Sequence, residues 1–317
     1  MTFALEDFGS FHVGGRHVTT TDLAARLQSY TPDSPPREVD PNGAYWIEQA
    51  YVQFFIPLGA KARRPVVFLH GGGLTGVTWD RTPDGRAGWL HAFLRAGHPV
   101  FVVDQPERGR AGFCALPDRW HGVPISRPEH EAWTLFRFGD REGYETRTPF
   151  PGCDFPIEAL TAFTMQFVPR WTTTRAAHIK AFRAVLERLG PCTVVCHSQG
   201  GDTAHAVLAE RPDLIEALVS IEPSGFTPPP PDARLTGLRV LYVYGDYIER
   251  EPMWAHLDGV ARDHVGRLRA AGADVTWLDL PAEGLRGATH MVMMDHASDR
   301  SAGLVLDWLA SDNRTSA

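Results

Sequence analysis

Short apolar runs alternate with amphipathic stretches along most of the chain. Residues 65–70, 99–104 and 193–196 are mostly apolar and rich in valine, as is typical of strands buried on both faces of a parallel sheet. Residues 88–97, after the first of these runs, carry apolar side chains at helical spacing. A strand, a helix and a second strand at this spacing predict a right-handed βαβ unit.

The same alternation continues to the end of the chain. Further elements are predicted as strands at about 11–19, 44–57, 217–222, 239–244 and 274–280, and as helices at about 202–209, 255–271 and 301–310. About eight strands with helices between them predict an α/β protein with one mostly parallel central sheet flanked by helices.

Residues 112–171 interrupt this alternation. The segment has no long apolar run, but it contains many prolines and large aromatic side chains. A connection of about 60 residues is too long for an ordinary loop. We expect residues 112–171 to form a cap insertion over the strand ends that lines an apolar pocket, with residues 1–111 and 172–317 forming the core. A packed surface insertion without a ligand is the alternative.

Composition narrows the classes of partner. The 317 residues are 43% hydrophobic and 22% charged, which is ordinary for a globular protein. The formal net charge is −7 and no basic cluster is present, so a nucleic-acid partner is not expected. No apolar run reaches the roughly 18 residues of a membrane span, so no membrane is expected as a partner.

The four cysteines show no metal-ligand spacing, and we expect no metal and no cofactor. Cys192 and Cys196 lie at the two ends of one predicted strand and cannot pair there. Pairing of Cys114 with Cys153 requires the segment between them to fold back. The first residues show neither a basic region nor an apolar region, so no secretory signal is evident and we expect a reduced, cytoplasmic protein.

The candidate chemistry centres on Ser198, which stands between a predicted strand and a predicted helix. A sharp strand-to-helix turn that exposes a serine is a nucleophile elbow, usually written G-x-S-x-G. Small residues two before and two after the serine let the strand and helix backbones approach closely. Gly200 fills the second of these positions, and Cys196 replaces the first glycine. An ordinary loop serine is the alternative, because short motif matches are common.

A serine hydroxyl is a weak nucleophile, so it needs a base, and the base needs an orienting acid. In this type of fold the chain order is serine, acid, histidine. His290 and His296 both follow the last predicted strand, and we favour His290 because small residues flank it in its loop. Glu222 and Asp246 end neighbouring strands, so either carboxylate can reach the imidazole. The residues alone leave that choice open.

Negative charge that develops on the substrate oxygen needs backbone donors. The amide of Gln199, at the start of the helix after the serine, is one candidate. The glycine run after His70 supplies the other, and we favour Gly72, since glycine permits a close approach. The same run lacks the Gly-Lys-Ser/Thr ending of a phosphate-binding loop, so a nucleotide role is not expected.

Taken together, these residues resemble the α/β-hydrolase superfamily, and more narrowly the bacterial esterases that cleave esters on halogenated cyclic compounds. The matching stretches are HGGGLTG (70–76), TW (78–79), TPDGR (82–86), DQ (104–105), RGR (108–110), HSQ (197–199), EPSG (222–225) and TH (289–290). They span most of the chain except its ends.

The resemblance implies an α/β-hydrolase fold and a serine hydrolase that works without a cofactor and uses a glutamate as the triad acid. Carried over by position, the triad is Ser198, His290 and Glu222, and the amides of Gly72 and Gln199 form the oxyanion hole. Members of this group can carry adjacent cysteines where this chain has Gly72 and Gly73, and they can be exported.

We therefore expect a serine esterase that cleaves small-molecule carboxylic esters with a bulky apolar acyl or alcohol group through an acyl-enzyme, and a homodimer is compatible with the sequence. Lactone or amide cleavage, or acyl transfer, by the same triad is the open alternative. A non-catalytic ligand receptor on the same scaffold is disfavoured, because such proteins usually lack a triad member or the backbone donors.

Overall fold

The computed structural model describes residues 3–60, 64–117, 119–229 and 235–311. Its strands are β1 (Leu5–Thr20), β2 (Arg26–Gln28), β3 (Arg37–Val39), β4 (Gly43–Pro57), β5 (Val66–Leu69), β6 (Val100–Asp104), β7 (Cys192–His197), β8 (Ile215–Ile221), β9 (Arg239–Tyr244) and β10 (Asp274–Asp279). Its α-helices are α1 (Trp89–Arg95), α2 (Glu129–Leu135), α3 (Leu160–Thr164), α4 (Arg175–Leu189), α5 (Gln199–Glu210), α6 (Pro252–Ala270) and α7 (Ser298–Ala310).

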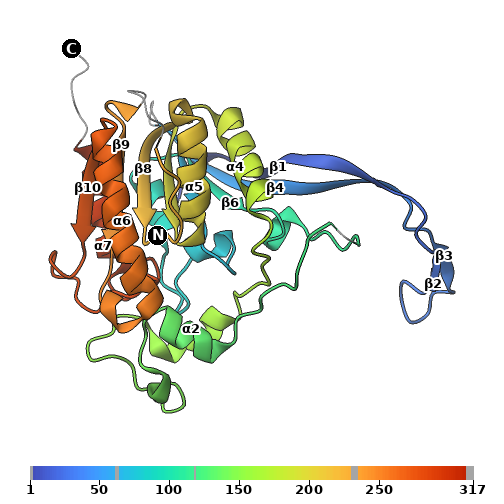
Figure 1. Cartoon of the computed structure of the whole chain (residues 1–317), viewed down its shortest axis with the longest axis horizontal. Coiled ribbons are helices and arrows are strands. Elements are labelled where there is room, and N and C mark those ends of the chain that lie inside the picture. The colour runs from blue at the N-terminus through green and yellow to red at the C-terminus, as the bar shows by residue number, and fades with distance from the viewer. Residues whose placement is uncertain (1–2, 61–63, 118, 230–234, 312–317) are drawn as a thin grey trace.

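Eight of these strands form one sheet in the order β1-β4-β6-β5-β7-β8-β9-β10. The pairs from β6 to β10 are parallel, whereas β1 with β4 and β4 with β6 are antiparallel. The predicted α/β class, with a mostly parallel sheet of eight strands between helices, is therefore confirmed. Figure 1 shows β1 and β4 continuing away from the body as a long ribbon, with β2 and β3 near its far end.

The sheet separates two hydrophobic cores, because successive side chains of a strand point to opposite faces. In β5, Val66 and Phe68 belong to the core that includes residues of α1 and α7. Val67 and Leu69 belong to the core on the other face, which α4, α5 and α6 cover. Burial on both faces explains why β5 and β7 read as continuous apolar runs.

Five of these strands and helices were not expected from the sequence, including α2 and α3 within residues 112–171. The helix α4 has a buried stripe that includes Phe182 and Val185, but the polar and charged residues between them weaken its apolar pattern. The strands β2 and β3 have only three residues each and are mostly exposed, so they carry little apolar signal.

The segment 112–171 lies beyond the carboxyl ends of the parallel strands, where α2 is seen in Figure 1. Its aromatic side chains pack closely on one another: the ring centroids of Phe138 and Phe155 are 4.0 Å apart, and those of Phe155 and Phe163 are 5.3 Å apart. Trp133, Phe138 and Phe163 have no exposed surface. The expectation that these rings line a pocket is therefore wrong for these three, because no space for a ligand adjoins them. The division into a core and a cap stays a prediction.

Within the described part of the chain, no helix is long and apolar enough to cross a membrane. The four cysteines are free thiols, and Cys114 and Cys153 do not form a disulfide.

Candidate active site

Ser198 occupies the turn between β7 and α5, where its backbone has φ 51° and ψ −119°. A positive φ is unfavourable for a residue with a side chain and is found preferentially at functional sites. Gly200 explains how the turn closes, since a Cβ there would lie 2.7 Å from the carbonyl oxygen of His70 on the neighbouring loop. The strand, the strained serine and the glycine together have the geometry of a nucleophile elbow.

The glycine run after β5 packs directly against this turn. A Cβ at Gly71 would lie 3.1 Å from Ser198 Cβ, and one at Gly72 would lie 2.6 Å from Gln199 Oε1. His70 anchors the run, because its ring accepts a bond from the Gln105 amide at Nε2 (3.2 Å) and donates from Nδ1 to the Gly71 carbonyl (2.8 Å). The run that contains Gly72 therefore lies beside Ser198 and the Gln199 side chain, and the assignment of the Gly72 and Gln199 amides as oxyanion donors stays a prediction.

His290 is fully buried and bound on three sides. Its Nδ1 donates to Glu222 Oε2 at 2.5 Å, and its backbone carbonyl accepts a bond from His197 Nε2 at 2.9 Å. Its ring lies against Trp254, with centroids 4.0 Å apart. His197 immediately precedes Ser198, so this bond ties the histidine loop to the elbow. Among the residues that the structure describes, none forms a hydrogen bond with the other ring nitrogen, Nε2.

Glu222 follows β8 with φ 40° and has no exposed surface. Besides His290, it accepts two bonds from Arg137, Nη1 to Oε2 at 2.8 Å and Nη2 to Oε1 at 2.5 Å. The Gly245 amide donates a further bond to Oε1 at 2.8 Å. The sequence reasoning missed Arg137, although an isolated arginine between Phe136 and Phe138 is a signal that a buried carboxylate lies nearby.

The two alternatives to Glu222 and His290, which are Asp246 and His296, make other contacts. Asp246 accepts bonds from the amides of Tyr247 and Gly287, both at 2.9 Å, so its carboxylate fixes the loop that leads to His290. His296 is half exposed, and the nearest carboxylate to its ring is Asp84 at 3.9 Å. The structure therefore brings Glu222 and His290 together and holds Asp246 and His296 in other contacts.

Comparison with known proteins places this architecture in a family. Residues 64–258 match the family described as alpha/beta hydrolase fold. The chain belongs to this family. It is also 33% identical to a novel bacterial esterase whose structure is solved at atomic resolution, covering 98% of both chains with a TM-score of 0.84. A probable secreted lipase, phiG, of a fungal species (strain ATCC 74256) is 28% identical over 84% of this chain and 87% of its own length.

In this α/β hydrolase, burial and neighbouring charges set the protonation states of Glu222 and His290. Burial alone would raise the pKa of Glu222, but the positive charge of Arg137 and the bond from His290 outweigh it and hold the pKa at about 2. Burial also lowers the pKa of His290, although the neighbouring Glu222 partly opposes the shift. Near neutral pH the carboxylate is therefore ionised and the imidazole is neutral, so Nε2 presents a lone pair.

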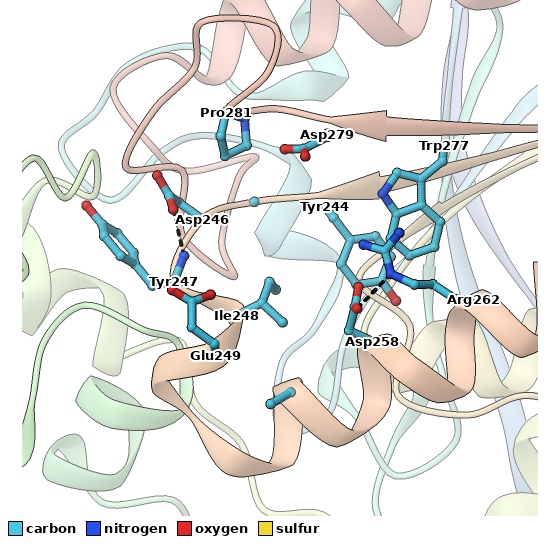
Figure 2. Close-up of a pocket in the computed structure, with 12 residues that line it drawn as sticks. Tyr244, Asp246, Tyr247, Ile248, Glu249, Asp258, Arg262, Trp277, Asp279 and Pro281 are labelled. Atoms are coloured by element: carbon cyan, nitrogen blue, oxygen red, sulfur yellow. Dashed lines mark hydrogen bonds and ion pairs between the residues drawn. The ribbon is translucent and has the colours of Figure 1, made fainter.

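The hydrolase also has a hollow of about 390 Å³ at the carboxyl ends of β9 and β10 (Figure 2), bordered by Asp246, Asp258 and Arg262. Neither Ser198 nor His290 lines it.

Within the part of the chain that the structure describes, no group of three or more histidine, cysteine or acidic side chains has an arrangement that holds a metal ion.

Proposed function

We propose that this α/β hydrolase cleaves carboxylic esters through an acyl-enzyme, with Ser198 as nucleophile, His290 as general base and Glu222 as the orienting acid. The observation that supports this most strongly is the bond from His290 Nδ1 to Glu222. This bond leaves Nε2 buried and without a hydrogen-bond partner among the described residues, in the loop tied to the elbow. The similarity to a bacterial esterase and to a probable lipase supports ester cleavage as the reaction.

The reaction runs in two halves. Ser198 Oγ attacks the ester carbonyl carbon while its proton passes to His290 Nε2. The attack converts the carbonyl group into a tetrahedral intermediate with a negatively charged oxygen. The imidazolium then returns the proton to the leaving alkoxide, which departs as the alcohol and leaves an acyl-serine. Water repeats the sequence and releases the acid. Glu222 holds the imidazole in one tautomer and stabilises its positive charge.

The backbone amides of Gly72 and Gln199 are the proposed donors to the oxyanion. Gln199 is the first residue of α5, so its N–H has no partner within the helix and the helix dipole favours an anion there. A side chain at Gly72 would displace the ends of the Arg170 and Gln199 side chains, which flank this position. Removing such a donor typically reduces turnover about a hundredfold to a thousandfold.

The proposed substrate is a small-molecule ester with a largely apolar body. Cleavage of lactones or amides, and acyl transfer to acceptors other than water, use the same triad and are the alternative reactions. The cytoplasmic location expected from the sequence also stays a prediction, and the fungal lipase is described as secreted.

The experiment is the substitution Ser198→Ala, assayed on para-nitrophenyl butyrate. We expect kcat to fall by about 10⁴-fold or more, while circular dichroism shows the fold retained. Ser34→Ala, in the turn between β2 and β3, is the matched control and should retain full activity. Turnover retained in folded Ser198→Ala would refute the proposal.

A further inference from the structure

Four arginines converge on the active site, and two of them already have fully buried carboxylate partners. Arg137 is paired with Glu222, and Arg108 contacts Glu107 at 3.3 Å. All four of these side chains have no exposed surface. In each of these two pairs, the negative charge of the glutamate neutralises the positive charge of the arginine. The remaining two, Arg127 and Arg170, belong to the segment that covers the strand ends.

Arg170 lies on the oxyanion side of the site. Its Nη1 donates to Gln199 Oε1 at 3.3 Å, and the same nitrogen abuts the backbone at Gly72. Among the residues that the structure describes, no carboxylate lies within ion-pair distance of this guanidinium. A half-buried positive charge therefore stands beside the two amides proposed to hold the carbonyl oxygen.

Arg127 lies on the histidine side of the site. Its guanidinium carbon is 5.4 Å from the centre of the Phe136 ring, which in turn stacks on His290 with centroids 5.5 Å apart. The Arg127 side chain is only 6% exposed, and its ion pair at 2.6 Å is with Glu131, which is 45% exposed. Solvent therefore weakens the neutralisation of Arg127 by Glu131.

An isolated backbone bridge joins Ile125, two residues before Arg127, to Arg170. The Ile125 amide donates to the Arg170 carbonyl at 2.7 Å, and the Arg170 amide donates to the Ile125 carbonyl at 3.1 Å. Arg127 and Arg170 are thus kept near one another. Burial lowers the pKa of both side chains, and the charge of Arg170 lowers the pKa of Arg127 further. Two partly dehydrated like charges with one exposed counter-charge are stabilised by a bound anion.

We propose that Arg127 and Arg170 form an anion subsite beside Ser198, and that the ester cleaved by this hydrolase carries a free carboxylate. The apolar ester expected from the sequence would therefore carry a negative charge at one end. This inference depends on the proposed esterase function. Hydrolysis adds water across the scissile ester bond and releases an alcohol and a second carboxylate, while the carboxylate held by the arginines is unchanged.

Two matched pairs of esters test the subsite. The first pair is mono-para-nitrophenyl adipate and para-nitrophenyl hexanoate, which places the charge on the acyl chain. The second pair is para-acetoxybenzoate and phenyl acetate, which places it on the leaving group. For at least one pair we expect the unmodified protein to prefer the anionic ester in kcat/KM, and added salt to reduce this preference, because salt screens the charges.

Arginine variants then locate the subsite. Arg170→Gln and Arg127→Gln should each lower the preference for the anionic ester about tenfold, mainly through KM, while Arg170→Lys keeps most of it. Arg147→Gln is the control: Arg147 lies in the same segment, is 41% exposed and is paired with Glu129, so the preference should not change. Thermal unfolding shows whether each variant is folded.

The outcomes separate this inference from the proposed function. Equal losses on the charged and the neutral ester in Arg170→Gln would mean that Arg170 only positions Gln199, and would overturn the subsite. A salt-independent preference, or no preference for either charged ester, would overturn it without using any variant. Turnover that survives Ser198→Ala would instead refute the proposed function.

Discussion

The ends of β8 and β9 invite comparison, because these neighbouring strands each lead to a carboxylate that the sequence offers as the triad acid. At the end of β8, Glu222 accepts bonds from His290, from both terminal nitrogens of Arg137 and from the Gly245 amide. After β9, the carboxylate of Asp246 accepts bonds from the backbone amides of Tyr247 and Gly287. The Glu222 carboxylate therefore contacts the His290 imidazole, whereas the Asp246 carboxylate holds the loop that carries His290.

This difference teaches that a position at the end of a strand does not decide the role of a carboxylate. The two residues nevertheless act on the same histidine, because Asp246 fixes the loop at Gly287, three residues before His290. Arg137 links the two sites, since its Nε donates to the Asp246 carbonyl at 2.8 Å while its other nitrogens hold Glu222. Glu222 is therefore the proposed orienting acid and Asp246 a positioning residue.

The largest expected effect separates the two carboxylates directly. Glu222→Gln should lower kcat by about 10⁴-fold, because an amide does not hold the imidazole in the required tautomer or stabilise its charge. Asp246→Asn should lower kcat less than about tenfold, because the amide oxygen still accepts one of the two backbone bonds. Steady-state kinetics of both folded variants checks this. A larger loss in Asp246→Asn would show that the roles are reversed.

The second effect concerns stability. Arg137→Leu leaves the Glu222 carboxylate buried without its main counter-charge, and breaking a buried pair in this way typically costs about 3–5 kcal/mol. Arg147→Leu breaks an exposed pair with Glu129 and should cost less than about 1 kcal/mol. Urea unfolding measures both free energies. Similar values for the two variants would contradict the structural importance of the Arg137–Glu222 pair.

The smallest effect is a shift in pH dependence. Catalysis needs neutral His290, and burial lowers its pKa, so kcat/KM should be full at neutral pH and fall only as the pH drops through a midpoint below 6.5. Glu222 raises the pKa of His290, so residual activity in Glu222→Gln should show a still lower midpoint, whereas Asp246→Asn should leave it unchanged. A midpoint above 6.5 in the unmodified protein would contradict this account.

The same argument gives the sign of acid denaturation. The pKa of Glu222 is held at about 2, below the ordinary glutamate value of 4.5. Folding therefore gains stability from this group above pH 4.5, and the gain is lost as the pH falls through about 2.

The central strands and the elbow could be predicted because their signals are local. β5, β6 and β9 lie within one residue of the predicted limits, since burial on both faces demands continuous apolar runs. The helix after Ser198 begins at Gln199 rather than near residue 202, because glycines and polar residues in its first turn weaken the helical pattern.

The partners of the site could not be predicted from local patterns. Arg137 and Glu222 are 85 residues apart along the chain, and Glu222 and His290 are 68 residues apart. The packing of the segment 112–171 brings Arg137 to Glu222, whereas the order of strands in the sheet brings the loops that carry Glu222 and His290 together. The residues alone leave Glu222 and Asp246 as alternatives, and the resemblance to a family of esterases favours Glu222.

The most direct test of the triad is the rate at which a fluorophosphonate probe modifies Ser198, with the modified peptide identified by mass spectrometry. We predict a single adduct on Ser198 that forms readily in the unmodified protein and in Asp246→Asn, but forms at least a hundredfold more slowly in folded Glu222→Gln. An adduct on another residue, no adduct at all, or equal rates in the two carboxylate variants would contradict the account.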